Sequence, residues 1–119
     1  FFNNGLDAAP NLTEFPDLGR GMVTHKITDN GTFRAPTLRN IELSAPYMHD
    51  GRFKTLEEVL DHYSDGVKYA KNLGAFVDKI GTVGGPYGLE PIEKLYLVKF
   101  LKTLTDTTFV HNPDIQNPF

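Results

Sequence analysis

The sequence predicts a mainly α-helical fold with long loops. An apolar pattern with helical spacing follows Thr55 and a second one follows Pro91, while the stretches between them are rich in Gly, Pro, Asn and Asp. These two patterns carry the prediction. A small β-ribbon over residues 19–33 is the one strand-like option, because Asn30-Gly31 is a strong hairpin signal between short apolar runs.

The composition of the 119-residue chain is that of an ordinary globular domain, with 39% hydrophobic and 23% charged residues. Its length allows one domain at most. The formal net charge of −3 argues against a nucleic-acid partner, since nucleic-acid-binding domains usually carry a basic patch. No apolar run approaches the roughly 18 residues that a membrane span needs.

The first helix is expected to begin after Thr55. The Thr55 hydroxyl can accept a first-turn N–H, and Glu58 stands three residues on, which completes a capping box. The apolar side chains follow at spacings of three, four and seven: Leu56, Val59, Leu60 and Tyr63. Tyr63 is therefore expected on the buried face and His62 elsewhere on the helix. A buried tyrosine hydroxyl needs a partner, either a backbone carbonyl or a metal.

The last helix is expected to begin at Pro91, because proline is favoured in a helix first turn. Its broad apolar stripe should pack on the first helix and is made of Ile92, Leu95, Tyr96, Leu97, Phe100, Leu101 and Leu104. The rest of the chain is expected to be less regular. Residues 1–20 indicate coil. In residues 64–88 a helix-like spacing is broken by Gly74 and gives way to a glycine-rich loop, and residues 106–119 indicate a tail that wraps the surface.

Residues 33–63 hold the highest density of side chains that can bind a metal. Four of them lie between positions 48 and 63, on a glycine turn and on the helix that follows it: Met48, His49, His62 and Tyr63. Loops held by a rigid scaffold often carry function, so this segment is the candidate site.

The run PTLRNIELSAPYMHDGRFKTLEEVLDHY, residues 36–63, resembles the signature of the bacterial dihaem cytochrome c peroxidase family in its C-terminal haem domain. The family includes the dihaem enzyme that matures methylamine dehydrogenase. EKLYLVKFLKTLTD resembles its last helix, HNPDIQNPF a common tail, and FFNNGLD the segment that follows the haem-attachment motif. The resemblance implies a cytochrome c-like haem domain over most of the chain.

The chain contains no cysteine, so C-x-x-C-H, the motif that attaches haem c covalently, is absent. In the family this motif lies a short way before a segment like FFNNGLD. The resemblance therefore implies that residues 1–119 form a single partial domain, truncated after the attachment motif, and that haem c belongs to the full-length protein.

The resemblance also implies the haem-binding residues. Tyr63 falls where the peroxidases have an axial methionine and where the methylamine dehydrogenase-maturing enzyme has a ligating tyrosine, so Tyr63 is the expected iron ligand. Met48 is the alternative, since methionine is also a common haem ligand. Arg39 is expected to be buried and to pair with a haem propionate. His49, like His62, is expected to form hydrogen bonds near the cofactor.

Two further residues are candidates for a calcium site. Ser44 and Pro46 fall where the family's peroxidases supply backbone carbonyls to a calcium ion between their two domains. Half of that site would come from the other domain.

The implied function is that of the C-terminal, electron-transferring haem domain of a periplasmic dihaem cytochrome c peroxidase-like oxidoreductase. Its implied partners are the N-terminal haem domain, a small electron-donor protein, and hydrogen peroxide or a protein substrate. No catalytic acid or base is expected here, and the fragment alone is expected to be inactive. The alternative is a haem-free binding or interaction module of the same fold, which the absence of cysteine favours for the fragment as given.

Overall fold

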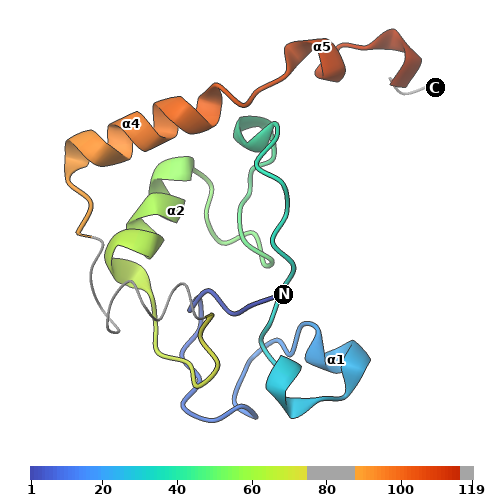
Figure 1. Cartoon of the computed structure of the whole chain (residues 1–119), viewed down its shortest axis with the longest axis vertical. Helices are drawn as coiled ribbons and strands as arrows, with labels where there is room; N and C mark the ends of the chain where they lie inside the picture. Colours follow the sequence, from blue (N-terminus) through green and yellow to red (C-terminus); the bar gives the residue numbers. More distant parts are fainter. Residues whose placement is uncertain (75–87, 116–119) are drawn as a thin grey trace.

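The computed structural model describes residues 1–74 and 88–115. Its helices are short and are joined by long irregular segments (Figure 1). The helix-like spacing expected around Phe76, Val77 and Ile80, and most of the glycine-rich loop after it, lie outside the described residues. None of the described helices is long and apolar enough to cross a membrane.

Helix α2, Leu56–Asp61, begins as the sequence predicts. The backbone N–H of Glu58 donates to the Thr55 hydroxyl at 3.2 Å, and the Glu58 carboxylate accepts from the backbone N–H of Thr55 at 3.2 Å. This reciprocal pair satisfies two N–H groups that the helix itself leaves without partners. At its C-terminal end α2 widens into the π-helical turn η3, His62–Gly66.

Helix α4, Pro91–Lys102, begins with proline in its first turn and carries a second capping box between Glu90 and Glu93. It packs on α2 and on η2, Ile41–Leu43, which confirms the predicted pairing of the two helices (Figure 1). The Lys94 ammonium lies 2.6 Å from the Asp61 carboxylate across the α2–α4 contact. Of the predicted apolar stripe, five residues remain more than a third exposed: Ile92, Leu95, Tyr96, Leu97 and Phe100.

The predicted β-ribbon over residues 19–33 is wrong. This segment forms α1, Gly21–Thr24, and η1, Ile27–Asp29, and the one bridge within it is a parallel contact between Gly19 and Thr32. A two-residue hairpin turn of the common type needs positive φ at both central residues. Gly31 has φ 68°, but Asn30 has φ −61° and donates its amide to the carbonyl of Leu12 at 2.9 Å.

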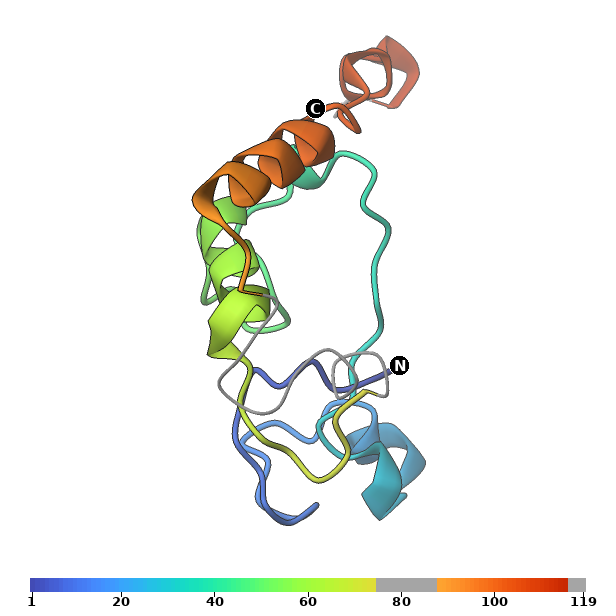
Figure 2. The ribbon, with the colours of Figure 1, turned by 60° about the vertical axis from the view of Figure 1, so that its left-hand side comes forward.

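The N-terminal segment, residues 1–9, pairs through its backbone with distant parts of the chain. Isolated bridges join Phe2 to Phe33, and Asn3 and Ala9 to residues 73 and 70. The small core beside it consists of Ala9, Phe15 and Ala70, with Leu12, Leu18 and Leu73 packed around them. In Figure 2 the segments that form this small core lie below α2 and α4, and the chain after residue 33 runs along one side between the two.

The C-terminal residues do not wrap the surface as expected. The described part contains α5, Thr107–Val110, and η4, Pro113–Ile115, which extend beyond the end of α4 (Figure 1). Hydrogen bonds to Asn40 hold the start of this tail. The backbone N–H of Asp106 donates to the Asn40 side-chain carbonyl at 2.6 Å, and the N–H of Asn40 donates to the carbonyl of Leu104 at 3.1 Å.

Candidate functional site

The two candidate iron ligands, Met48 and Tyr63, meet at one side chain. The amide nitrogen of Asn4 donates to the sulfur of Met48 at 3.3 Å and to the hydroxyl of Tyr63 at 3.4 Å. Met48 comes from the glycine turn and Tyr63 from η3, so the fold brings together two groups that the sequence offered as alternatives. Both residues are half-buried.

Met48 is held by the tight turn that the sequence predicts. The backbone N–H of Tyr47 donates to the carbonyl of Phe53 at 2.7 Å and closes the turn. Met48 itself has φ 72°, a left-handed backbone conformation that residues other than glycine rarely adopt. The Tyr47 hydroxyl donates to the carbonyl of Ile41 at 3.0 Å, and burial is the main cause that raises the pKa of Tyr47.

His62 and Tyr63 exchange the places that helical spacing predicts. His62 is buried at 5% exposure, and its ring N–H donates to the backbone carbonyl of Asn4 at 3.1 Å. Burial lowers the pKa of His62, against a smaller opposing effect of that hydrogen bond. Tyr63 is only half-buried, with its ring 5.2 Å from that of His62. The expectation was wrong because the α-helix gives way to a π turn at His62, which changes the number of residues per turn.

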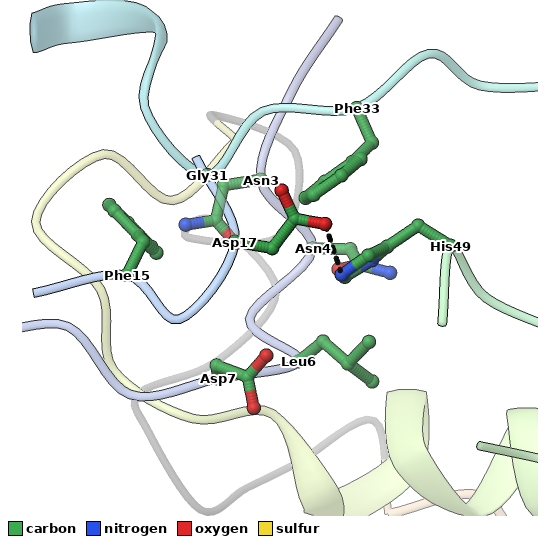
Figure 3. A pocket seen from close by; sticks show the side chains of 9 residues that line it. All are labelled: Asn3, Asn4, Leu6, Asp7, Phe15, Asp17, Gly31, Phe33 and His49. Carbon is green, nitrogen blue, oxygen red and sulfur yellow. Dashed lines mark ion pairs between the residues drawn. The ribbon is translucent and has the colours of Figure 1, made fainter. Parts of the chain in front are cut away.

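His49 lines a small pocket together with Asn4, the residue that contacts Met48 and Tyr63. Its ring stacks on Phe33 with centroids 3.6 Å apart, and its Nε2 atom lies 3.9 Å from the Asp17 carboxylate (Figure 3). The pocket that these residues help to line has a volume of about 10 Å³, which is room for one water molecule.

Arg39 is exposed rather than buried. Its guanidinium is 67% exposed and lies 3.3 Å from the Asp106 carboxylate. Ser44 and Pro46 also lie at the surface, where the Ser44 hydroxyl donates to the carbonyl of Ile41 at 2.9 Å.

Two residues of the site were missed by sequence reasoning. One is Asn4. The other is Arg52, whose guanidinium donates to both carboxylate oxygens of Asp7 at 3.0 and 3.1 Å, to Asp50 at 2.7 Å and to the carbonyl of Leu6 at 3.1 Å. Arg52 thus fastens the Met48 turn to the N-terminal segment, and its hydrogen bond holds the pKa of Asp50 below the usual range. The signals available were the matches of FFNNGLD, for Asn4, and of residues 36–63, for Arg52, to family segments; they marked the segments and neither of these two residues.

A larger hollow of about 530 Å³ opens beside α2, and Phe53 and His62 contribute to its wall. Five of its nine lining residues are charged: Arg52, Glu58, Asp61, Asp65 and Lys68. Neither Met48 nor Tyr63 lines it. The candidate site therefore rests on the contacts around Asn4 and not on this charged hollow.

The donor set around Asn4 fits a haem iron. Thioether sulfur and phenolate oxygen are both axial ligands that proteins use for haem. Within residues 1–74 and 88–115, no group of three or more His, Cys, Asp or Glu side chains lies together as a site for a bare metal ion would require. Covalent attachment of the haem would have to come from cysteines outside this sequence, which has none.

Comparison with known proteins decides the relationship. The chain is 35% identical over 89 residues to the cytochrome-c peroxidase IdrP2 of Denitromonas iodatirespirans, a match that covers 75% of this chain and 21% of that protein. It is 39% identical over 90 residues to the methylamine utilization protein MauG of Methylorubrum extorquens, covering 74% of this chain and 24% of MauG. The chain is homologous to the C-terminal region of the dihaem cytochrome c peroxidases and MauG.

The likeness to the peroxidase–MauG family extends to structure. A crystal structure of a MauG-like protein associated with microbial copper homeostasis matches with a TM-score of 0.75 and 40% sequence identity, over 99% of this chain and 38% of that one. Against the cytochrome c551 peroxidase of Nitrosomonas europaea the identity is 35% over 92% of this chain and 26% of the peroxidase. The chain therefore spans a minor part of its relatives' length. No protein-family model matches it.

Proposed function

We propose that this chain is the C-terminal, electron-transferring haem domain of a periplasmic dihaem cytochrome c peroxidase-like oxidoreductase. One observation carries the proposal. In a chain homologous to that region, the Met48 sulfur and the Tyr63 hydroxyl converge on one amide, so that a haem ligand is available whichever of the two is used. A haem bound there would supply one-electron redox chemistry.

Tyr63 is the proposed axial ligand and Met48 the alternative. Tyrosinate is a hard anionic donor that favours ferric iron, as in catalase. The Asn4 amide donates to the Tyr63 oxygen, and a hydrogen bond to the charged form of a group favours that form. His62 supports the geometry by fixing the backbone of Asn4 through its ring N–H.

The remaining residues have proposed supporting roles. Arg39 is a partner for a haem propionate, because its exposed guanidinium is held by one carboxylate only, that of Asp106, among the described residues. His49 is a hydrogen-bonding group whose ring is held by Phe33. Ser44 and Pro46, at the surface, are candidate carbonyl donors to a calcium ion shared with a second domain.

The proposed partners follow from the same assignment. They are an N-terminal haem domain of the same protein, a small electron-donor protein, and hydrogen peroxide or a protein substrate. The relatives are named as peroxidases and as a methylamine utilization protein, which supports a peroxide or a protein as substrate.

The test is an absorption spectrum of the full-length gene product, oxidised and reduced, beside Tyr63→Phe and Met48→Leu variants. We expect c-type bands whose ferric form changes in Tyr63→Phe and stays the same in Tyr69→Phe, a control at an exposed tyrosine. Bands that change only in Met48→Leu would make Met48 the ligand. A protein without haem bands would overturn the proposal and leave the haem-free binding module.

A further inference from the structure

We propose that Asn4 is a positioning residue that selects Tyr63 over Met48 as the haem ligand; this inference rests on the proposed function. Asn4 is the residue that contacts both candidates, through a single nitrogen. It also accepts the His62 ring N–H at its backbone carbonyl. Met48, Tyr63 and His62 are therefore all hydrogen-bonded to Asn4.

The position of the Asn4 amide is set by buried groups on both sides. Asn3 is 4% exposed, and its side-chain oxygen accepts from the backbone N–H of Gly5 at 2.8 Å. Gly5 has φ 69°, and a Cβ there would lie 2.8 Å from the carbonyl of Lys68. The backbone around Asn4 is consequently fixed by its neighbours, so its side chain presents a donor at a defined place rather than adapting to either acceptor.

The two acceptors are of unequal strength. The Met48 thioether is a weak acceptor, whereas the Tyr63 oxygen is a strong one and gains further when it carries charge. An amide N–H aimed at both therefore stabilises an anionic Tyr63 oxygen much more than it stabilises the Met48 sulfur. Because binding to a ferric iron uses the anionic oxygen, the amide favours Tyr63 in the competition for the iron.

Removing the donor should shift this competition. In Asn4→Leu the side chain keeps about the same size and loses both N–H groups. Met48 loses a weak hydrogen bond and Tyr63 a charge-assisted one. We expect the ratio of Tyr63-ligated to Met48-ligated protein to fall about tenfold. Because methionine ligation raises haem potential, the reduction potential should rise as well.

The experiment measures the ferric absorption spectrum and the reduction potential of the full-length, haem-loaded protein. Tyr63→Phe and Met48→Leu supply the two reference spectra. Asn4→Asp is the second variant, because it keeps the size of the side chain and lacks the N–H donors, and it serves if Asn4→Leu does not fold. Asn11→Leu is the control, at an exposed asparagine whose amide donates to Glu14.

The expected result is that Asn4→Leu and Asn4→Asp both move the spectrum toward that of Tyr63→Phe and that Asn4→Leu, which adds no charge, raises the potential, whereas Asn11→Leu does neither. Unchanged spectra and potentials in both Asn4 variants, in a protein whose spectrum responds to Tyr63→Phe, would overturn the role of Asn4 and leave the proposed function standing. A wild-type spectrum that responds only to Met48→Leu would also overturn it. A wild-type protein without haem would overturn both.

Discussion

The sulfur of Met48 and the hydroxyl of Tyr63 are acceptors of the same donor nitrogen. Two side chains from neighbouring elements thereby contact one group, one on a turn held by a backbone bridge and the other on a π-helical turn. If the proposed function holds, these two side chains are alternative haem ligands, and the strength of the hydrogen bond from Asn4 is the difference between them that we propose to test.

The capping box should make a measurable contribution to stability. Thr55→Ala removes the hydroxyl that accepts from Glu58 at the start of α2. We expect the free energy of unfolding to fall by about 1 kcal/mol, the usual cost of losing such a cap. The midpoint of urea denaturation of the full-length protein measures this. Thr13→Ala, at an exposed threonine, should leave the midpoint in place.

Two glycines should differ in how far alanine destabilises the fold. Gly31 has φ 68°, and a Cβ there would run into the ring of Phe15 in the small core. Gly31→Ala should therefore lower the free energy of unfolding by about 2 kcal/mol or more. Gly66→Ala places its Cβ 3.5 Å from the His62 ring, an ordinary contact, and should change stability by less than about 1 kcal/mol. Equal losses in the two thermal melts would contradict the packing described around Gly31.

The ion pairs of Arg52 and Arg39 should contribute differently to the free energy of unfolding. Arg52 holds Asp7, Asp50 and a backbone carbonyl at once, so Arg52→Ala should lower the free energy of unfolding by about 1–2 kcal/mol. Arg39 holds Asp106 at the surface, so Arg39→Ala should leave stability unchanged. Urea denaturation at low and at high salt measures both, and added salt should reduce the Arg52 effect.

Stability should fall as the solution becomes acidic, because of His62. Burial lowers its pKa in the folded protein, while the unfolded chain titrates near the ordinary value of about 6.5. Below that pH the unfolded state binds a proton that the folded state does not, so the free energy of unfolding decreases until the folded pKa is passed.

The comparison is with His62→Gln, which does not titrate and keeps a side-chain donor for the carbonyl of Asn4. Its melting temperature should depend less on pH between about 7 and 5 than that of the wild type. His111→Gln, at an exposed histidine, should follow the wild type. A wild-type slope retained in His62→Gln would assign the effect to another group.

Features encoded within a few residues could be predicted from the sequence. The capping box at Thr55, the start of α4 at Pro91 and the packing of these two helices are all confirmed. Each depends on short spacings of residue types whose preferences hold in most surroundings. The resemblance of residues 36–63 to a family signature was likewise local, and the comparisons confirm it.

Features that depend on distant contacts could not be predicted. The hairpin signal at Asn30 failed because its amide is engaged by Leu12, which lies in a different segment. The faces of His62 and Tyr63 were misassigned because apolar spacing assumes a uniform α-helix. Asn4 sits in a coil without periodicity, so nothing local distinguished its amide from that of any surface asparagine.

The docking of distant segments on the N-terminal residues has a consequence for synthesis. The carbonyl of Asn3 accepts from the N–H of Gly74, and the N–H of Ala9 donates to the carbonyl of Tyr69. A nascent chain cannot make these bonds until the later residues have left the ribosome, and closing such long loops slows folding. Asn3 and Ala9 therefore acquire these partners only once residues 69–74 are available, which makes the docking of this segment a late step in folding.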